Sequence, residues 1–279
     1  MRPATLAGAG AIVLWAFLGL LSRAAAAIPP LQLTAMSFGV AAVLGLGVLL
    51  ARGRLSDLRQ RPPAWAHGVG GLFGFHALYF AALAWAPAAE ANLINYSWPL
   101  LIVLLSAALL GLRLTGAHIA GTVLGAAGCA LLLGGGARLT AGAMPGYLAA
   151  VASAITWATY SVLSRRFFAT VPTGAVAGFC AASAVLAAAS HFAFEPTVVP
   201  ETQGWVAVLA LGAGPVGGAF FLWDIGMKRG DPRLLGTLAY ATPVASTLLL
   251  CAGGFAPFSG TLLASAALVA AGGLVAARA

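Results

Sequence analysis

Ten runs of about twenty apolar residues follow one another along this chain, and short polar or proline-containing breaks separate them. A helix needs about 20 apolar residues to cross the hydrocarbon core of a bilayer, and it satisfies all its own backbone polar groups. The chain is therefore expected to be an all-α polytopic membrane protein with the lipid bilayer as its surroundings. The predicted spans are residues 5–25, 31–51, 64–85, 89–111, 116–135, 146–166, 173–193, 204–227, 233–253 and 260–277.

Composition excludes the soluble classes of protein. Only 7% of the residues are charged, whereas soluble domains have about a quarter. The net charge of +8 would suit a nucleic-acid partner, but the arginines lie at the ends of spans and not on one polar face, so we expect no such partner. Cys129, Cys180 and Cys251 lie in apolar runs without CxxC or histidine pairing, which predicts no metal site and no cofactor.

The two halves of the chain repeat one another. The segment from Trp15 to Arg23 reads WAFLGLLSR, and the segment from Trp157 to Arg165 reads WATYSVLSR. Further on, YSWP at residues 96–99 matches YATP at residues 240–243. We therefore predict two five-helix repeats, residues 1–139 and 140–279, around a central cavity. Because five is an odd number of spans, the second repeat must be inverted relative to the first.

The basic residues select the orientation. With the N-terminus inside, twelve arginines and lysines fall in inner segments, and only Arg23 and Arg138 fall in outer ones. Positive charge is retained on the cytoplasmic side, so both termini are predicted to be cytoplasmic. The loop at 52–61 is basic, whereas its counterpart at 194–203 has no basic residue and two glutamates, as an inverted repeat requires.

Polar and aromatic side chains at mid-depth form the candidate solute site. In carriers with inverted repeats the solute binds near the midplane, at the interface between the repeats. An ionisable or strongly polar group at this depth is costly and is a functional candidate, although a histidine satisfied by a neighbouring helix would look the same. The predicted solute-binding residues are His76, Tyr79, Asn92, Tyr96, Trp98, Trp157, Tyr160 and Tyr240.

Proline and glycine suggest where these spans bend or pack. Pro99 and Pro243 occupy equivalent positions and are predicted hinges, with a kink that serves only packing as the alternative. The pairs Gly70/Gly74 and Gly214/Gly218 predict close approach between helices.

Charge is expected to be absent from the centre of the membrane. Only Glu90 and Asp224 lie near a span, both toward its end, and Asp224 can form a structural ion pair with Lys228 four residues later. A site without arginine or lysine is unsuited to sugar phosphates and nucleotides. Tyrosine and tryptophan rings can stack on an aromatic solute and hold an ammonium group over a ring face.

These residues resemble the drug/metabolite transporter superfamily. Ten spans in two inverted units, the W-A-x(4)-L-S-R segment in each unit and a proline in the fourth span of each are similar to the EamA-type repeat over the whole chain. The segments YSWP and WATY are similar to the bacterial aromatic amino-acid exporter (YddG-like) branch. That resemblance implies a cavity lined by His76, Tyr79, Tyr96, Trp98, Trp157 and Tyr160. Many members carry a glutamate just after the fourth span, whereas this chain reads GLRLT at 111–115.

The resemblance implies an inner-membrane transporter that exports aromatic and other neutral amino acids by alternating access. An efflux carrier for amphiphilic drugs or other neutral metabolites is the alternative. An enzyme is not expected, because mid-depth carboxylate pairs, HExxH and a matched Ser/His/Asp set are all missing from the sequence. We also expect a small-molecule substrate and no obligatory protein partner.

Overall fold

The structure, a computed structural model, describes residues 1–134 and 139–278, and the regular elements of these residues are all helices. Arg138, assigned above to an outer segment, lies outside the described residues. Within the described residues, nine helical segments are long and apolar enough to cross a membrane, and Gly260–Ala276 adds a shorter apolar helix of 17 residues.

The helices, in chain order, are α1 (Pro3–Ala16), α2 (Leu18–Ala24), α3 (Pro30–Ala51), η1 (Leu55–Leu58), α4 (Pro62–Trp85), α5 (Ala88–Asn95), α6 (Trp98–Leu110), α7 (Gly116–Leu133), η2 (Ala141–Ala143), α8 (Met144–Arg166), α9 (Ala175–Phe194), α10 (Thr202–Ala213), η3 (Gly214–Gly218), α11 (Ala219–Arg229), α12 (Pro232–Ala239), α13 (Ala241–Ala252) and α14 (Gly260–Ala276). The predicted spans agree with these bounds to within about three residues wherever the chain is described.

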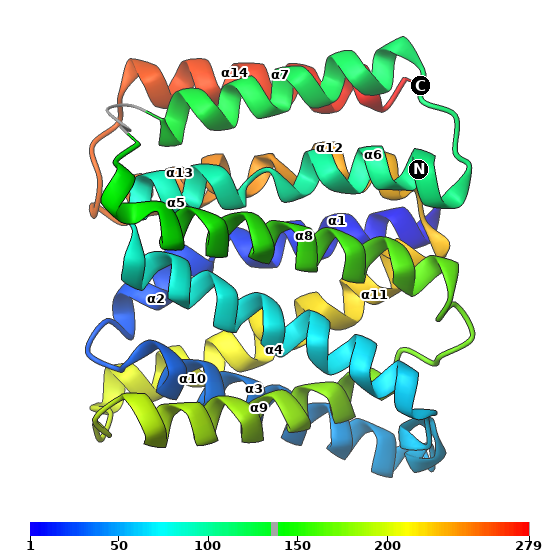
Figure 1. Cartoon of the computed structure of the whole chain (residues 1–279), viewed down its shortest axis with the longest axis vertical. Helices are drawn as coiled ribbons and strands as arrows, with labels where there is room; N and C mark the ends of the chain where they lie inside the picture. Colours follow the sequence, from blue (N-terminus) through cyan, green and yellow to red (C-terminus); the bar gives the residue numbers. More distant parts are fainter. Residues whose placement is uncertain (135–138, 279) are drawn as a thin grey trace.

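The long helices run roughly side by side, and both termini lie at the same end of the bundle (Figure 1). We call this the termini end and the opposite one the far end. Helices α7 and α14 form one edge of the bundle and α3 and α9 the other, while α1, α4, α8 and α11 lie between them.

Glycine allows the closest helix contacts. A Cβ added at Gly226 of α11 would lie 2.6 Å from the Cα of Gly8 on α1, and one added at Gly121 of α7 would lie 2.5 Å from the carbonyl oxygen of Gly272 on α14. Only a residue without a side chain permits backbones to approach so closely in lipid.

Four of the spanning units are interrupted within the described residues. The breaks between α5 and α6 and between α12 and α13 come just before Pro99 and Pro243, so each proline lies in the first turn of the following helix. Proline is tolerated there because the first-turn N–H groups have no partner within the helix. The other breaks, at Phe17 and at the π-helical turn η3, have no counterpart in the sequence predictions.

The prediction of close approach is wrong for the pair Gly70 and Gly74, whereas a Cβ added at Gly218 would lie 3.4 Å from Leu14 of α1. A Cβ at Gly70 would meet nothing within 4 Å, and one at Gly74 would make only an ordinary contact. The glycines that pack closely in this part of α4 are Gly68, against the ring of Phe179, and Gly71, against the ring of Tyr160. The equivalent pair Gly214 and Gly218 instead bounds η3, where a π-helical turn replaces regular α-helix.

Candidate functional site

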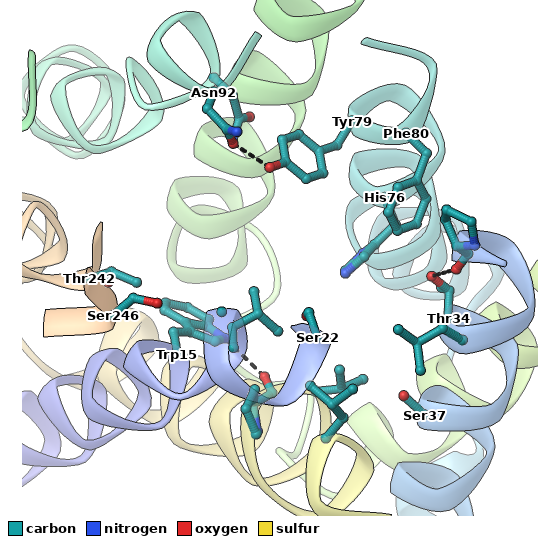
Figure 2. Close-up of a pocket in the computed structure, with 18 of the residues that line it drawn as sticks. Trp15, Ser22, Thr34, Ser37, His76, Tyr79, Phe80, Asn92, Thr242 and Ser246 are labelled. Carbon is teal, nitrogen blue, oxygen red and sulfur yellow. Dashed lines mark hydrogen bonds between the residues drawn. The ribbon is translucent and has the colours of Figure 1, made fainter. Parts of the chain in front are cut away.

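A cavity of about 660 Å³ occupies the half of the bundle nearer the far end. It extends from the segment between α2 and α3, where Ala25 and Ile28 line it, down to Trp15, Trp98 and Trp157. Helices α2, α3, α4, α5 and α13 supply most of its wall, so both halves of the chain contribute to it (Figure 2).

Four tryptophans from four helices pack together at the bottom of the cavity. Trp15, Trp98, Trp157 and Trp223 form a cluster in which every pair of ring centroids is 5.0 to 6.4 Å apart. Two of the indole N–H groups are bonded, Trp15 Nε1 to the carbonyl of Pro215 and Trp223 Nε1 to the hydroxyl of Ser161. This tryptophan cluster is a closed aromatic floor between the cavity and the termini end.

The structure brings most of the predicted site residues into this cavity. Lining positions are taken by His76, Tyr79, Asn92, Tyr96, Trp98 and Trp157, and also by the predicted hinge Pro243.

Three predicted residues lie elsewhere. Tyr160 is buried below the floor, with its ring 5.0 Å from that of His67, and Tyr240 packs against Gly125. Pro99 is also outside the lining, and its carbonyl faces Gly236 of α12. Tyr160 follows Trp157 by three residues in α8 and so lies about one turn nearer the termini end, whereas Tyr240 is close in sequence to the lining residue Pro243 but faces α7. A choice based on residue type and approximate depth included both.

Two polar groups of the wall are held in defined orientations. The Tyr79 hydroxyl donates to Asn92 Oδ1, which connects α4 to α5. His76 Nδ1 lies 2.7 Å from the carbonyl oxygen of Leu72, one turn earlier in α4. The His76 ring also contacts Phe38 of α3, with ring centroids 5.1 Å apart.

Sequence reasoning missed the hydroxyl groups of the wall. These belong to Ser22, Thr34, Ser37, Thr242, Ser246 and Thr247. Thr34 and Thr247 donate to the carbonyl four residues earlier, as hydroxyls in helices commonly do. Ser37 and Thr242 differ, because their hydroxyl oxygens are buried without a hydrogen-bond partner among the described residues. For Thr242 one signal was available in the sequence, since the match between YSWP at 96–99 and YATP at 240–243 makes Thr242 the equivalent of Trp98.

Charge is absent from the described lining. Among the described residues around the cavity, the polar side chains carry hydroxyl, amide, imidazole or indole groups. None of these residues is an acid, a lysine or an arginine. A solute that enters this space must therefore be recognised by neutral donors, neutral acceptors and ring faces.

The model of the EamA-like transporter family matches residues 2–134 and again residues 144–277. The chain belongs to this family.

Relatives of this transporter match it over nearly its whole length. It is 56% identical to the aromatic amino acid exporter YddG of Ancylobacter novellus over 277 residues, which is 98% of this chain and 96% of that protein. The protein of the same name from Salmonella typhimurium is 26% identical over 288 residues, with the same coverage. A solved crystal structure at 55% identity superposes with a TM-score of 0.94 and covers 99% of this chain and 97% of the other. The transporter is thus a multi-pass protein of the bacterial inner membrane.

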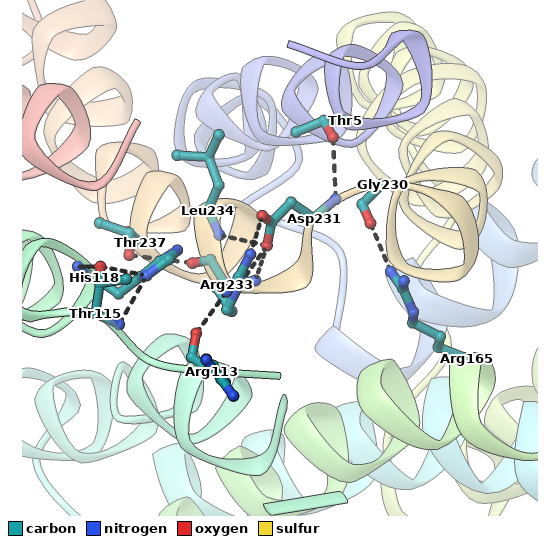
Figure 3. A network of polar contacts seen from close by, with 10 residues as sticks. All are labelled: Thr5, Arg113, Thr115, His118, Arg165, Gly230, Asp231, Arg233, Leu234 and Thr237. Carbon is teal, nitrogen blue, oxygen red and sulfur yellow. Dashed lines mark hydrogen bonds and ion pairs between the residues drawn. The ribbon is translucent and has the colours of Figure 1, made fainter. Parts of the chain in front are cut away.

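At its termini end the transporter is closed by polar contacts (Figure 3). Arg233 bonds the carboxylate of Asp231 at 2.8 Å and the carbonyl oxygen of Arg113 at 2.6 Å, which joins α12 to the segment after α6. The Asp231 N–H donates to the hydroxyl of Thr5 on α1, and Arg165 of α8 donates to the carbonyl of Gly230. Burial opposes ionisation of Asp231, but the bonds and charge of Arg233 hold the pKa of that carboxyl below its usual value.

A buried ion pair adds to this closure. Lys228 Nζ lies 2.7 Å from Asp224 Oδ1, which confirms the pairing predicted from their spacing. Both side chains are almost fully buried, at 6% and 4% exposed. Lys228 also donates to the carbonyl of Val171, and Thr173 donates to Asp224, so the pair joins α11 to the segment between α8 and α9.

Proposed function

We propose that this transporter exports aromatic and other neutral amino acids from the cytoplasm. The observation that carries the proposal is the cavity, whose wall combines aromatic rings with uncharged donors and acceptors. Its volume of about 660 Å³ lies in the range of pockets that hold small molecules. The printed names of the relatives, aromatic amino acid exporters, support the same class of solute.

For the architecture we propose ten spans in two inverted repeats, residues 1–139 and 140–279, with both termini in the cytoplasm. The twelve basic residues on the inner side and two on the outer side support this orientation. As a helix of 17 residues, α14 is about 26 Å long, and modest bilayer thinning or flanking polar residues accommodate such a length. In this orientation the far end faces outward, so the cavity faces the outer side.

For the mechanism we propose alternating access. The tryptophan cluster and the polar contacts of the termini end separate the cavity from the cytoplasm, and export requires this side to open while the far end closes. Breaks in four spanning units, two of them next to Pro99 and Pro243, supply points where helix halves can reorient. The proposed solute contacts are His76, Tyr79, Asn92, Tyr96, Trp98 and Trp157.

Counterflow into liposomes tests this function. Purified protein in liposomes preloaded with L-phenylalanine should accumulate external labelled L-phenylalanine, L-tryptophan, L-threonine or L-methionine above protein-free liposomes. Flux of none of these would refute the proposal. The alternative solutes, amphiphilic drugs or other neutral metabolites, fit the largely apolar wall. They would be indicated by dye efflux that amino acids do not inhibit.

A further inference from the structure

The hydrogen bond of His76 determines what its second ring nitrogen can do. A backbone carbonyl only accepts, so His76 Nδ1, 2.7 Å from the Leu72 oxygen, must carry the proton. In the neutral ring the other nitrogen, Nε2, is then an acceptor. Figure 2 shows the His76 ring pointing into the cavity. His76 therefore presents an acceptor to the solute.

The hydrogen bond of Asn92 has the opposite consequence. Its Oδ1 accepts from the Tyr79 hydroxyl, which leaves the amide nitrogen with two N–H donors. Asn92 lines the cavity on a different wall from His76, as Figure 2 shows. The two walls of the cavity therefore differ in hydrogen-bonding character although neither carries a charge.

Ser37 extends the accepting wall. Its hydroxyl is buried without a partner in the part of the chain that the structure describes, and it comes from α3, whose Phe38 contacts the His76 ring. An unpaired buried hydroxyl is unfavourable because it has lost its hydrogen bonds to water, so a ligand that pairs with it recovers this cost. Both Ser37 and His76 can accept a hydrogen bond from an ammonium group, which has three donors and no acceptor.

We propose that the transporter binds its amino acid in one orientation, with the ammonium group toward His76 and Ser37 and the carboxylate toward the amide nitrogen of Asn92. This assignment rests on the proposed function and adds which neutral group recognises each end of the zwitterion. The side chain of the amino acid then lies on the aromatic floor, where any apolar or aromatic group of suitable size can be accepted. Specificity for α-amino acids arises from the two walls and not from the floor.

Two partial ligands separate the two ends experimentally. Phenethylamine has the ammonium group and lacks the carboxylate, whereas 3-phenylpropionate has the carboxylate and lacks the ammonium group. Each is tested as an inhibitor of L-phenylalanine counterflow, and its inhibition constant is measured for wild type and variants. Because the two ends are held separately, both partial ligands should inhibit the wild-type protein.

Variants of the accepting wall should affect phenethylamine alone. His76→Leu removes the acceptor and should weaken inhibition by phenethylamine by about tenfold or more, while the inhibition constant of 3-phenylpropionate should change less than about twofold. His76→Gln retains an acceptor oxygen and should restore most of the phenethylamine affinity. It also tests the assignment if His76→Leu does not fold.

Variants of the donating wall should give the reverse pattern. Asn92→Leu removes both N–H donors and introduces no charge, so inhibition by 3-phenylpropionate should weaken by about tenfold or more, while inhibition by phenethylamine should change less than about twofold. Ser183→Ala is the control for a substitution outside the cavity. Like that of Ser37, the Ser183 hydroxyl is buried without a partner among the described residues, but Ser183 does not line the cavity. It should change neither inhibition constant.

Several results would overturn the orientation. The first is that the His76 variant weakens inhibition by 3-phenylpropionate and the Asn92 variant weakens inhibition by phenethylamine. The second is that each variant weakens inhibition by both partial ligands equally. The third is that neither partial ligand inhibits the wild-type protein. Failure of the proposed function is distinct, because the wild-type protein would then transport no L-phenylalanine at all.

Discussion

The buried pair between Asp224 and Lys228 allows a quantitative test of what closes the termini end. The two charged atoms are 2.7 Å apart and the side chains are 4% and 6% exposed, so solvent screens neither charge. Removal of one partner of such a pair costs about 3–5 kcal/mol, because the other charge is left buried and uncompensated. We expect Lys228→Met to lie in this range, since Asp224 would retain only the hydroxyl of Thr173.

The companion variants define the interaction energy. Asp224→Asn should cost less than Lys228→Met, because the amide oxygen can still accept from Lys228 and the ammonium keeps the carbonyl of Val171. The double variant should be more stable than the sum of the two single losses predicts, by about 1–3 kcal/mol. Arg54→Met is the comparison for loss of a more exposed cation, because Arg54 is 56% exposed although its partner Asp57 is only 12% exposed, so solvent screens this pair and its loss should cost less than that of Lys228.

Thermal unfolding of the purified protein in detergent, followed by tryptophan fluorescence, measures these differences. A change of 1 kcal/mol shifts Tm by roughly 2–4 °C in chains of this order of size, so Lys228→Met should lose roughly 6–20 °C. Equal losses for Lys228→Met and Arg54→Met would refute the argument from burial. Strict additivity in the double variant would show that the two residues do not act as a pair.

Three further variants test the cavity wall, the helix packing and the closure. Tyr96→Ala removes a ring that lines the cavity and should lower L-phenylalanine counterflow several-fold at unchanged membrane insertion, as checked by the amount of protein recovered from membranes. Gly71→Ala places a methyl group against the ring of Tyr160 and should destabilise by about 1–3 kcal/mol, whereas Gly70→Ala meets nothing within 4 Å and should be neutral or slightly stabilising; a similar Tm for both would contradict the packing. Asp231→Asn should lower Tm at pH 7 and make Tm less sensitive to acid. Because its folded-state pKa is lowered, the stabilisation by Asp231 is present above about pH 4 and is lost as the pH falls through the folded-state pKa. An unchanged acid dependence would exclude this role.

The spans were predictable from the sequence because the bilayer sets their length. Each run of apolar residues has to satisfy its own backbone, so its ends coincide with polar or proline-containing breaks. The pairing of Asp224 with Lys228 was predictable for a similar reason, since residues four apart meet on a helix. The break at Phe17 was not, because it has no sequence signal distinct from an ordinary apolar stretch. The break at η3 was missed although Pro215 and three glycines mark it, since Gly214 and Gly218 were interpreted as packing positions.

The candidate site was predictable in part. Rare side chains at mid-depth, such as His76 and Asn92, identified much of the cavity wall because they are costly in lipid. Tyr160 was included although it lies one turn too deep, since the position of the floor depends on how the tryptophans of four helices meet. Tyr240 was included although it faces α7, because the direction of its ring depends on the packing of Gly125. Ser37 was missed because serine is common in membrane helices, and only the packing shows that its hydroxyl has no partner.

The tryptophan cluster has an optical consequence. Indoles 5.0 to 6.4 Å apart couple electronically, so together they produce an exciton signal in circular dichroism that depends on their mutual geometry. The four rings come from α1, α6, α8 and α11, and opening of the cavity toward the termini end, as the proposed alternating access requires, would change their mutual geometry. The protein therefore carries an intrinsic, label-free spectroscopic reporter at the aromatic floor of the cavity.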